Sequence, residues 1–185
     1  GARVEEIASE KRATPHRMTP FAVVERRRVT YPAEDSEPAA LAVAGPFHLE
    51  ATVRVLQRRP TNLVEVWDDE RYLRVLATPD GLVLVEVTNH GTVDEPEVRF
   101  SVLRGSASTA ARAHVGRTLR AMLGMDVDPE PLRTLTDAER PLRPIARALR
   151  GMRPPRFTEL FEAFTNVVPF QQVSLDAGVA IVGRV

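Results

Sequence analysis

The sequence contains no cysteine, little aromatic character and no long apolar run. Without cysteine the chain has no disulfide, no thiolate zinc site and no cysteine nucleophile. Its four histidines, His16, His48, His90 and His114, are too scattered for a recognisable metal motif. No stretch reaches the roughly eighteen apolar residues of a membrane span. The start also lacks the basic-then-apolar pattern of a secretion signal, which favours the cytoplasm. We predict no metal, no cofactor and no membrane partner.

The charges are balanced overall but unevenly placed. The 185 residues are 43% hydrophobic and 27% charged, which is typical of one folded domain or one domain with part of a second. The formal net charge of zero argues against nucleic acid as a partner. However, six arginines and no acidic residue lie between Arg140 and Arg156. This arginine stripe fits either a phosphate-binding face or an ordinary solvated helix face.

Residues 46–125 are expected to form an α+β domain after an irregular lead-in, residues 1–45, part of which can be a tag. Apolar and polar residues alternate along five segments, and Pro79 and Gly81 stand where a tight turn needs them. Short turns between strands favour an antiparallel five-stranded sheet. The predicted strands are 47–55, 63–68, 72–77, 82–88 and 97–103.

From Ser108 onward the apolar spacing becomes helical. Residues 111, 115, 119 and 122 share one helix face, and Gly124 is a natural stop. The helix from Thr158 is expected to bury a face containing Leu160, Phe161, Phe164 and Val168, and Ser174 is expected to cap the last helix. The predicted helices are 108–124, 130–136, 141–150, 158–168 and one from 174 onward.

Two sequence blocks resemble a known enzyme family. They are Gly151-Met-Arg-Pro-Pro-Arg-Phe-Thr-Glu-Leu-Phe-Glu-Ala-Phe164 and Gln171-Gln-Val-Ser-Leu175. In this order and at this distance they resemble bacterial 3-methyladenine DNA glycosylase II, a base-excision repair enzyme of the helix-hairpin-helix superfamily. Residues 119–128 are similar to the linker between the two domains of that family. The resemblance covers residues 46 to 185.

The resemblance implies a fold and an activity. The fold is an antiparallel α+β domain like half of a TATA-binding fold, followed by an all-α glycosylase domain, whose first helices would occupy residues 126–185. The implied enzyme is a monofunctional N-glycosyl hydrolase that flips an alkylated base out of double-stranded DNA and cleaves its glycosidic bond. Its partner is double-stranded DNA containing alkylated bases.

The resemblance also implies a set of DNA-binding residues. In the family, a side chain at the turn occupied here by Gln171 and Gln172 fills the gap left by the flipped base. By position Gln172 is the wedge and Gln171 lies beside it, while Arg153 and Arg156 are placed to contact phosphates. Ser174 belongs to the same group, with its hydroxyl directed at the start of the last helix. The preceding Val168-Pro-Phe170 departs from the family, where small or aliphatic residues are usual.

No catalytic residue is assigned in this chain. The family's phosphate-binding hairpin and catalytic Asp lie beyond the position of Val185, so the 185-residue chain is expected to be inactive on its own. Asp126 and Asp128 fall in the linker, and Asp176 suits the dipole of a helix start. A glycosylase whose catalytic part is missing from this chain is the favoured interpretation. A non-catalytic protein that binds damaged DNA, or an interaction domain without a DNA role, stays open.

Overall fold

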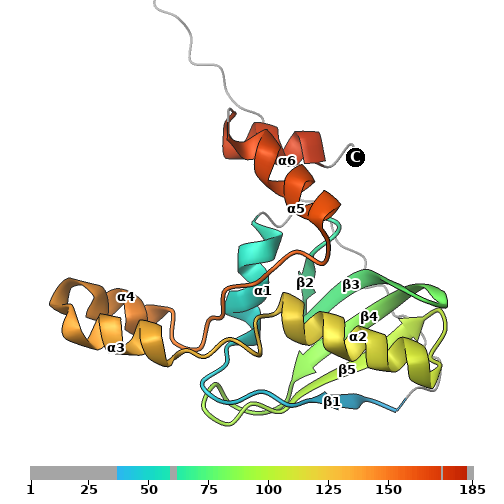
Figure 1. Ribbon diagram of the computed structural model, residues 1–185, viewed down its shortest axis with the longest axis horizontal. Coiled ribbons are helices and arrows are strands. Elements are labelled where there is room, and N and C mark those ends of the chain that lie inside the picture. The colour runs from blue at the N-terminus through green and yellow to red at the C-terminus, as the bar shows by residue number, and fades with distance from the viewer. Residues whose placement is uncertain (1–36, 59–61, 172, 183–185) are drawn as a thin grey trace, which may run out of the picture. The chain divides into compact units, whose positions relative to one another are not determined.

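The computed structural model describes residues 37–58, 62–171 and 173–182, and its centre is an antiparallel five-stranded sheet (Figure 1). The strand order is β1-β5-β4-β3-β2, and every neighbouring pair is antiparallel. This confirms the predicted α+β class. The strands are β1 (Ala39–Leu41), β2 (Val66–Asp68), β3 (Arg71–Thr78), β4 (Gly81–Asn89) and β5 (Val98–Arg104).

The first predicted strand, 47–55, is wrong, because helix α1 (Leu49–Gln57) occupies it. His48 caps this helix by accepting a hydrogen bond from the amide of Ala51 on its Nδ1. The buried positions of α1 follow a helical spacing of three and one, from Leu49 through Thr52 and Val53 to Leu56 and Gln57. The fifth strand is instead β1, which lies inside the expected irregular lead-in and pairs with β5.

Helix α2 (Thr109–Met122) begins and ends where the sequence predicted. Ser108 accepts the amide of Ala111 on its Oγ, and Gly124 adopts a φ of +63° just after the helix. Both α1 and α2 pack on the same face of the sheet (Figure 1), and their apolar side chains join the inward residues of β3, β4 and β5 in one core. We call residues 39–125 the sheet region.

The remaining helices have almost no buried apolar surface. None of the side chains of α3, α4 or α5 is buried. The buried face predicted for the helix from Thr158 is therefore wrong: Leu160 is 71% exposed, Phe161 67% and Phe164 58%. The elements are α3 (Glu130–Ala138), η1 (Arg140–Leu142), α4 (Arg143–Ala148), α5 (Leu160–Val167), η2 (Val168–Phe170) and α6 (Leu175–Val182).

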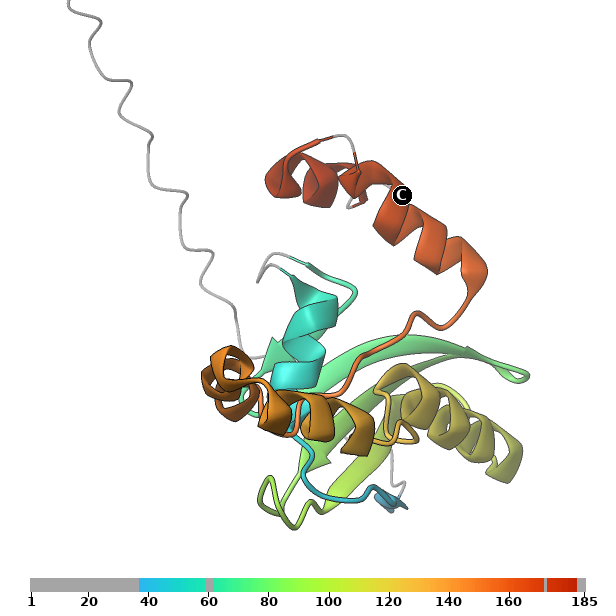
Figure 2. The ribbon, with the colours of Figure 1, turned by 60° about the vertical axis from the view of Figure 1, so that its left-hand side comes forward.

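Helices α3 and α4 lie side by side as a hairpin, and α5, η2 and α6 follow as a second group (Figure 2). We call the second group, residues 158–182, the arm. None of the helices in the described part of the chain has the length and apolar content that a membrane crossing requires.

Candidate nucleic-acid interface

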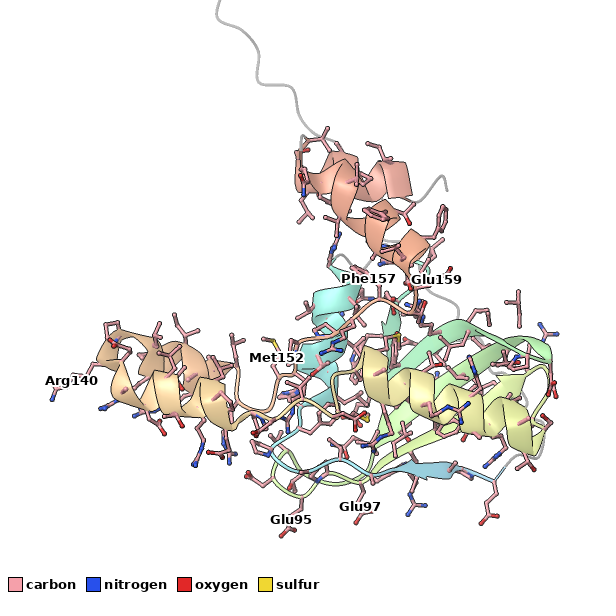
Figure 3. All side chains as sticks on the ribbon, viewed as in Figure 1. Glu95, Glu97, Arg140, Met152, Phe157 and Glu159 are labelled. Atoms are coloured by element: carbon pink, nitrogen blue, oxygen red, sulfur yellow. The ribbon has the colours of Figure 1, made fainter. Side chains whose placement is uncertain are left out.

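An extended strap, residues 151–157, connects the α3–α4 hairpin to the arm and runs beside α1, with Met152 and Phe157 near its two ends (Figure 3). Its backbone is tied to the sheet region at both ends. The carbonyl of Gly151 accepts the amide of His48 at 2.7 Å, and the amide of Arg156 donates to the carbonyl of Met122 at 2.8 Å. Phe157 packs against the core. The strap therefore lies fixed along the sheet region.

Arg153 of the strap points into the protein. Its side chain is 2% exposed, and its guanidinium donates to the carbonyls of Val127 at 2.7 Å, Ala44 at 3.0 Å and Pro46 at 3.2 Å. Burial lowers the pKa of Arg153, an effect that the charge of Asp128 opposes. Arg153 is thus not the surface cation that a phosphate contact requires, and in this structure it joins three segments of backbone.

The arginine stripe of residues 140–156 does not form one continuous surface. Besides the buried Arg153, Arg143 donates to the carbonyl of Asp137 and Arg150 forms an ion pair with Asp94. Arg140 points away from the protein at the tip of the hairpin (Figure 3). Three arginines of the stripe have exposed side chains that make no hydrogen bond or ion pair to any described residue: Arg140, Arg147 and Arg156.

A buried polar cluster joins the arm to the sheet. Arg74 occupies an inward position of β3, is 5% exposed, and forms ion pairs with Glu65 and, at 2.5 Å, with Glu162 of α5. The hydroxyl of Tyr72 donates to Glu65. Glu162 also accepts from the amide of Thr158 at 2.9 Å and from its hydroxyl at 2.5 Å. We call Glu65, Tyr72, Arg74 and Glu162 the polar cluster.

The polar cluster shifts the pKa values of Glu162 and Tyr72. Burial raises the pKa of Glu162, but hydrogen bonds from Thr158 and Arg74 outweigh burial and hold that pKa below its ordinary value. Burial, together with the negative charge of Glu162, raises the pKa of Tyr72 well above its usual range. At neutral pH the cluster therefore holds an ionised Glu162 and a neutral Tyr72.

A second arginine holds the other end of α5. Arg58, just after α1, donates to the carbonyl of Asn166 at 2.9 Å, and its guanidinium lies 4.3 Å from the centroid of the Phe170 ring. The same ring packs against Gly178 of α6, where an added Cβ would come within 2.4 Å of it. Phe170, part of the segment that departs from the family pattern, is thus a packing residue between Arg58 and α6.

The predicted wedge turn follows Phe170. Gln171 is exposed, its amide donates to the carbonyl of Val168, and it borders an open pocket of about 280 Å³ together with Arg58 and Phe170. Gln172 lies outside the described residues. Ser174 is exposed and accepts the amide of Ala177 on its Oγ at 3.3 Å, so it caps α6 as expected.

The acidic residues of the linker have structural partners. Asp126 pairs with Arg120, and Asp128 accepts the amide of Glu130 at 3.0 Å.

A pocket of about 510 Å³ lies between β3 and α5 and contains Glu65, Glu162 and His114 in its lining. Within residues 37–58, 62–171 and 173–182, no group of three or more acidic or histidine side chains is placed to hold a metal ion.

Sequence reasoning missed the contacts of Arg58 and Arg74. One signal was available for Arg74, because it stands between Tyr72 and Leu76 at an inward position of an alternating strand. A charge at such a position requires a buried partner of opposite sign. Nothing in the sequence around Arg58 indicates that its side chain contacts Asn166, which lies more than a hundred positions later.

A family model and a solved structure both relate this chain to DNA glycosylases. Residues 39–159 match the family model described as the AlkA N-terminal domain. Six chains of solved structures match, among them a 3-methyladenine DNA glycosylase from Archaeoglobus fulgidus, with a TM-score of 0.59 and 21% sequence identity. That match covers 80% of this chain, which spans only 49% of the glycosylase chain. No curated protein matches.

The family match extends from β1 through the sheet region and along the strap to Glu159. It crosses the expected boundary between residues 125 and 126, so that boundary stays a prediction. The match covers well over half of the chain and agrees with the α+β fold of the structural neighbour. The chain belongs to the AlkA N-terminal domain family.

Proposed function

We propose that this chain is the N-terminal portion of a base-excision repair DNA glycosylase that removes alkylated bases from duplex DNA by base flipping, and that it acts in the cytoplasm. The observation that carries the proposal is the family match over residues 39–159. The fold shared with a 3-methyladenine DNA glycosylase supports it. In this proposal the whole protein is a monofunctional N-glycosyl hydrolase, and the 185-residue chain binds DNA without hydrolysing its glycosidic bonds.

The proposed DNA contacts lie at the arm and the strap. Gln172 is the wedge that fills the gap in the base stack, with Gln171 beside it and Ser174 fixing the start of α6 next to the turn. The exposure of Gln171 and Ser174 supports this assignment. Arg156 is the proposed phosphate contact, since its side chain is exposed. Arg153 contributes indirectly, because its buried hydrogen bonds hold the strap that carries Arg156.

The proposal is tested by measuring the affinity of the chain for two fluorescent duplexes, one normal and one with an abasic-site analogue, at several salt concentrations. We expect tighter binding to the abasic duplex and a clear loss of affinity with salt. Gln172→Ala should remove the preference for the abasic duplex. Arg156→Ala should lower the slope of log affinity against log salt by about 1, as for one lost phosphate contact.

Arg104→Ala is the matched control, because Arg104 is an exposed arginine on β5 outside the proposed contacts. It should leave both the slope and the preference unchanged. Affinity that depends neither on salt nor on Arg156 and Gln172 would leave an interaction domain without a DNA role. Release of 3-methyladenine from methylated duplex by the whole protein tests the reaction itself, and failure to release it would leave a damage-binding protein.

A further inference from the structure

The arm is attached to the sheet region by arginine contacts at the two ends of α5. Helix α5 buries none of its own side chains, so apolar packing does not set its position. Arg74 reaches the first turn at Glu162, and Arg58 reaches the last turn at the carbonyl of Asn166. These two contact residues are four positions apart, about one helical turn.

The contact at Arg74 is directional and buried. Its guanidinium is held between two carboxylates, Glu65 in the sheet region and Glu162 in the arm. Because Arg74 is 5% exposed, water competes poorly for these interactions. The planar donor group also restricts the angle at which Glu162 can approach. The Arg74–Glu162 contact therefore fixes the distance of the first turn of α5 from β3 and restricts the direction from which Glu162 approaches.

The contact at Arg58 fixes the other end of α5 and the turn after it. A cation at a helix C-terminus interacts favourably with the unpaired carbonyls there, and Asn166 supplies one of these. The same guanidinium lies over Phe170, one residue before Gln171. On its other side the Phe170 ring fits against Gly178, so α6 follows the position of the ring.

We infer that Arg58 and Arg74 are positioning residues, which fix α5, η2 and thereby Gln171 relative to the sheet region. This inference rests on the proposed function in one respect, namely that the turn at Gln171 faces DNA. The sheet region is then the rigid support from which the base-flipping turn is held. Two points of attachment on one helix restrict both its tilt and its rotation, which a single contact cannot do.

The first test measures the placement of the arm directly. The chain has no cysteine, so spin labels can be attached at Glu97→Cys, which lies at the edge of the sheet region (Figure 3), and Ala180→Cys of α6. Electron spin resonance should give a narrow distance distribution between them. Arg58→Met and Arg74→Met should each broaden or shift it, and Arg58→Lys should restore it, since lysine keeps the cation and a donor.

Arg99→Met is the matched control, because Arg99 is exposed on β5. The distribution should stay narrow in this variant. Arg74→Met leaves the buried Glu65 and the half-buried Glu162 without their cation and can unfold the chain. Arg58→Met then decides the question, since Arg58 is only half-buried. An unchanged distance in Arg58→Met, or equal broadening in Arg99→Met, overturns the inference.

The second test uses DNA. In Arg58→Met the preference for an abasic over a normal duplex should fall about tenfold, as expected for coupling between sites. Its salt dependence should stay that of the parent chain, because Arg156 is intact. If the parent chain shows no preference, the proposed function fails while the distance measurement still decides the positioning role. If Arg58→Met broadens the distance distribution but keeps the preference for the abasic duplex, the inference that Arg58 acts on DNA binding through the turn at Gln171 is wrong.

Discussion

The sheet region and the segments that follow it are held together by different forces. Among the residues whose side-chain burial the structure describes, every buried apolar side chain lies in the range from Leu41 to Met125. In the part of the chain beyond residue 125 whose side chains the structure describes, Arg153 is the only buried polar or charged one. Apolar burial specifies the sheet region, whereas Arg58, Arg74 and Arg153 fix the strap and the arm through polar contacts. Such contacts define orientation more sharply than they contribute stability.

The largest difference is expected between two leucines in helices on either side of this division. Leu119 of α2 is fully buried in the core, and Leu132 of α3 is 62% exposed. Leu119→Ala should lower the free energy of unfolding by about 2–5 kcal/mol, through lost burial and a residual cavity. Leu132→Ala should change it by less than about 0.5 kcal/mol. Urea denaturation followed by the fluorescence of Trp67, which packs against the core, measures both.

The same loss in both variants would contradict the comparison, because α3 would then be as tightly packed as α2.

A smaller effect is expected for two arginines of the strap. Arg153→Met leaves the carbonyls of Val127, Ala44 and Pro46 without their donors, which should cost ~2–3 kcal/mol of unfolding free energy. Arg156→Met, at an exposed position three residues later, should cost less than about 0.5 kcal/mol. Urea denaturation of the two variants gives the measurement. If Arg156→Met proves the more destabilising, the assignment of Arg153 as the structural arginine is wrong.

Where burial specifies the fold, the sequence was informative. The alternation in β3, β4 and β5 and the helical spacing in α2 predicted those elements correctly, because their apolar side chains face one core. The segment of α1 was misinterpreted because its alternation up to Val55 hid the helical spacing that includes Leu56. The amide-capping role of His48 was also missed.

Where polar contacts specify the fold, the sequence was a poor guide. The apolar spacing of α5 predicted the helix correctly, but an amphipathic pattern does not show whether its apolar face is covered. The arginine stripe suggested one surface, yet Arg143, Arg150 and Arg153 have separate partners that lie far away in sequence or on the backbone. Charge pairing over such distances leaves no periodic signal.

Within the arm, Gly178→Ala tests whether packing of Phe170 matters. A Cβ at position 178 would approach the ring of Phe170 to 2.4 Å, so the ring must move. Alanine favours a helix over glycine by about 1 kcal/mol, which offsets part of the strain. In Gly178→Ala we expect faster hydrogen exchange in η2 and α6, equivalent to a loss of about 1 kcal/mol in the free energy of local opening. Adding Phe170→Leu should relieve the strain; unchanged exchange in Gly178→Ala would mean that this contact does not hold α6.

The smallest expected effect is the response of the arm to acid. Burial raises the pKa of Glu162, but the interactions with Thr158 and Arg74 together lower it by more than burial raises it. The pKa in the folded state therefore lies below the ordinary value of 4.5. A carboxylate with a lowered folded pKa stabilises the folded state above its unfolded pKa and loses that contribution as the pH falls through the folded value. The docking of α5 should therefore be unchanged from pH 8 to about 5 and weaken below pH 4.5.

Because Glu162 is partly exposed and shares Arg74 with Glu65, we expect acid to weaken the docking of α5 by less than about 1 kcal/mol. Hydrogen exchange of the α5 amides between pH 3 and 7, corrected for the intrinsic pH dependence of exchange, measures it. Glu162→Gln keeps the side-chain size but removes the titrating charge, so its α5 amides should be less protected at pH 7 and show a smaller change towards acid. Equal pH dependence in both chains would assign the response to other carboxylates near the arm, such as Glu65 or Glu159, and would separate the docking of α5 from the charge of Glu162.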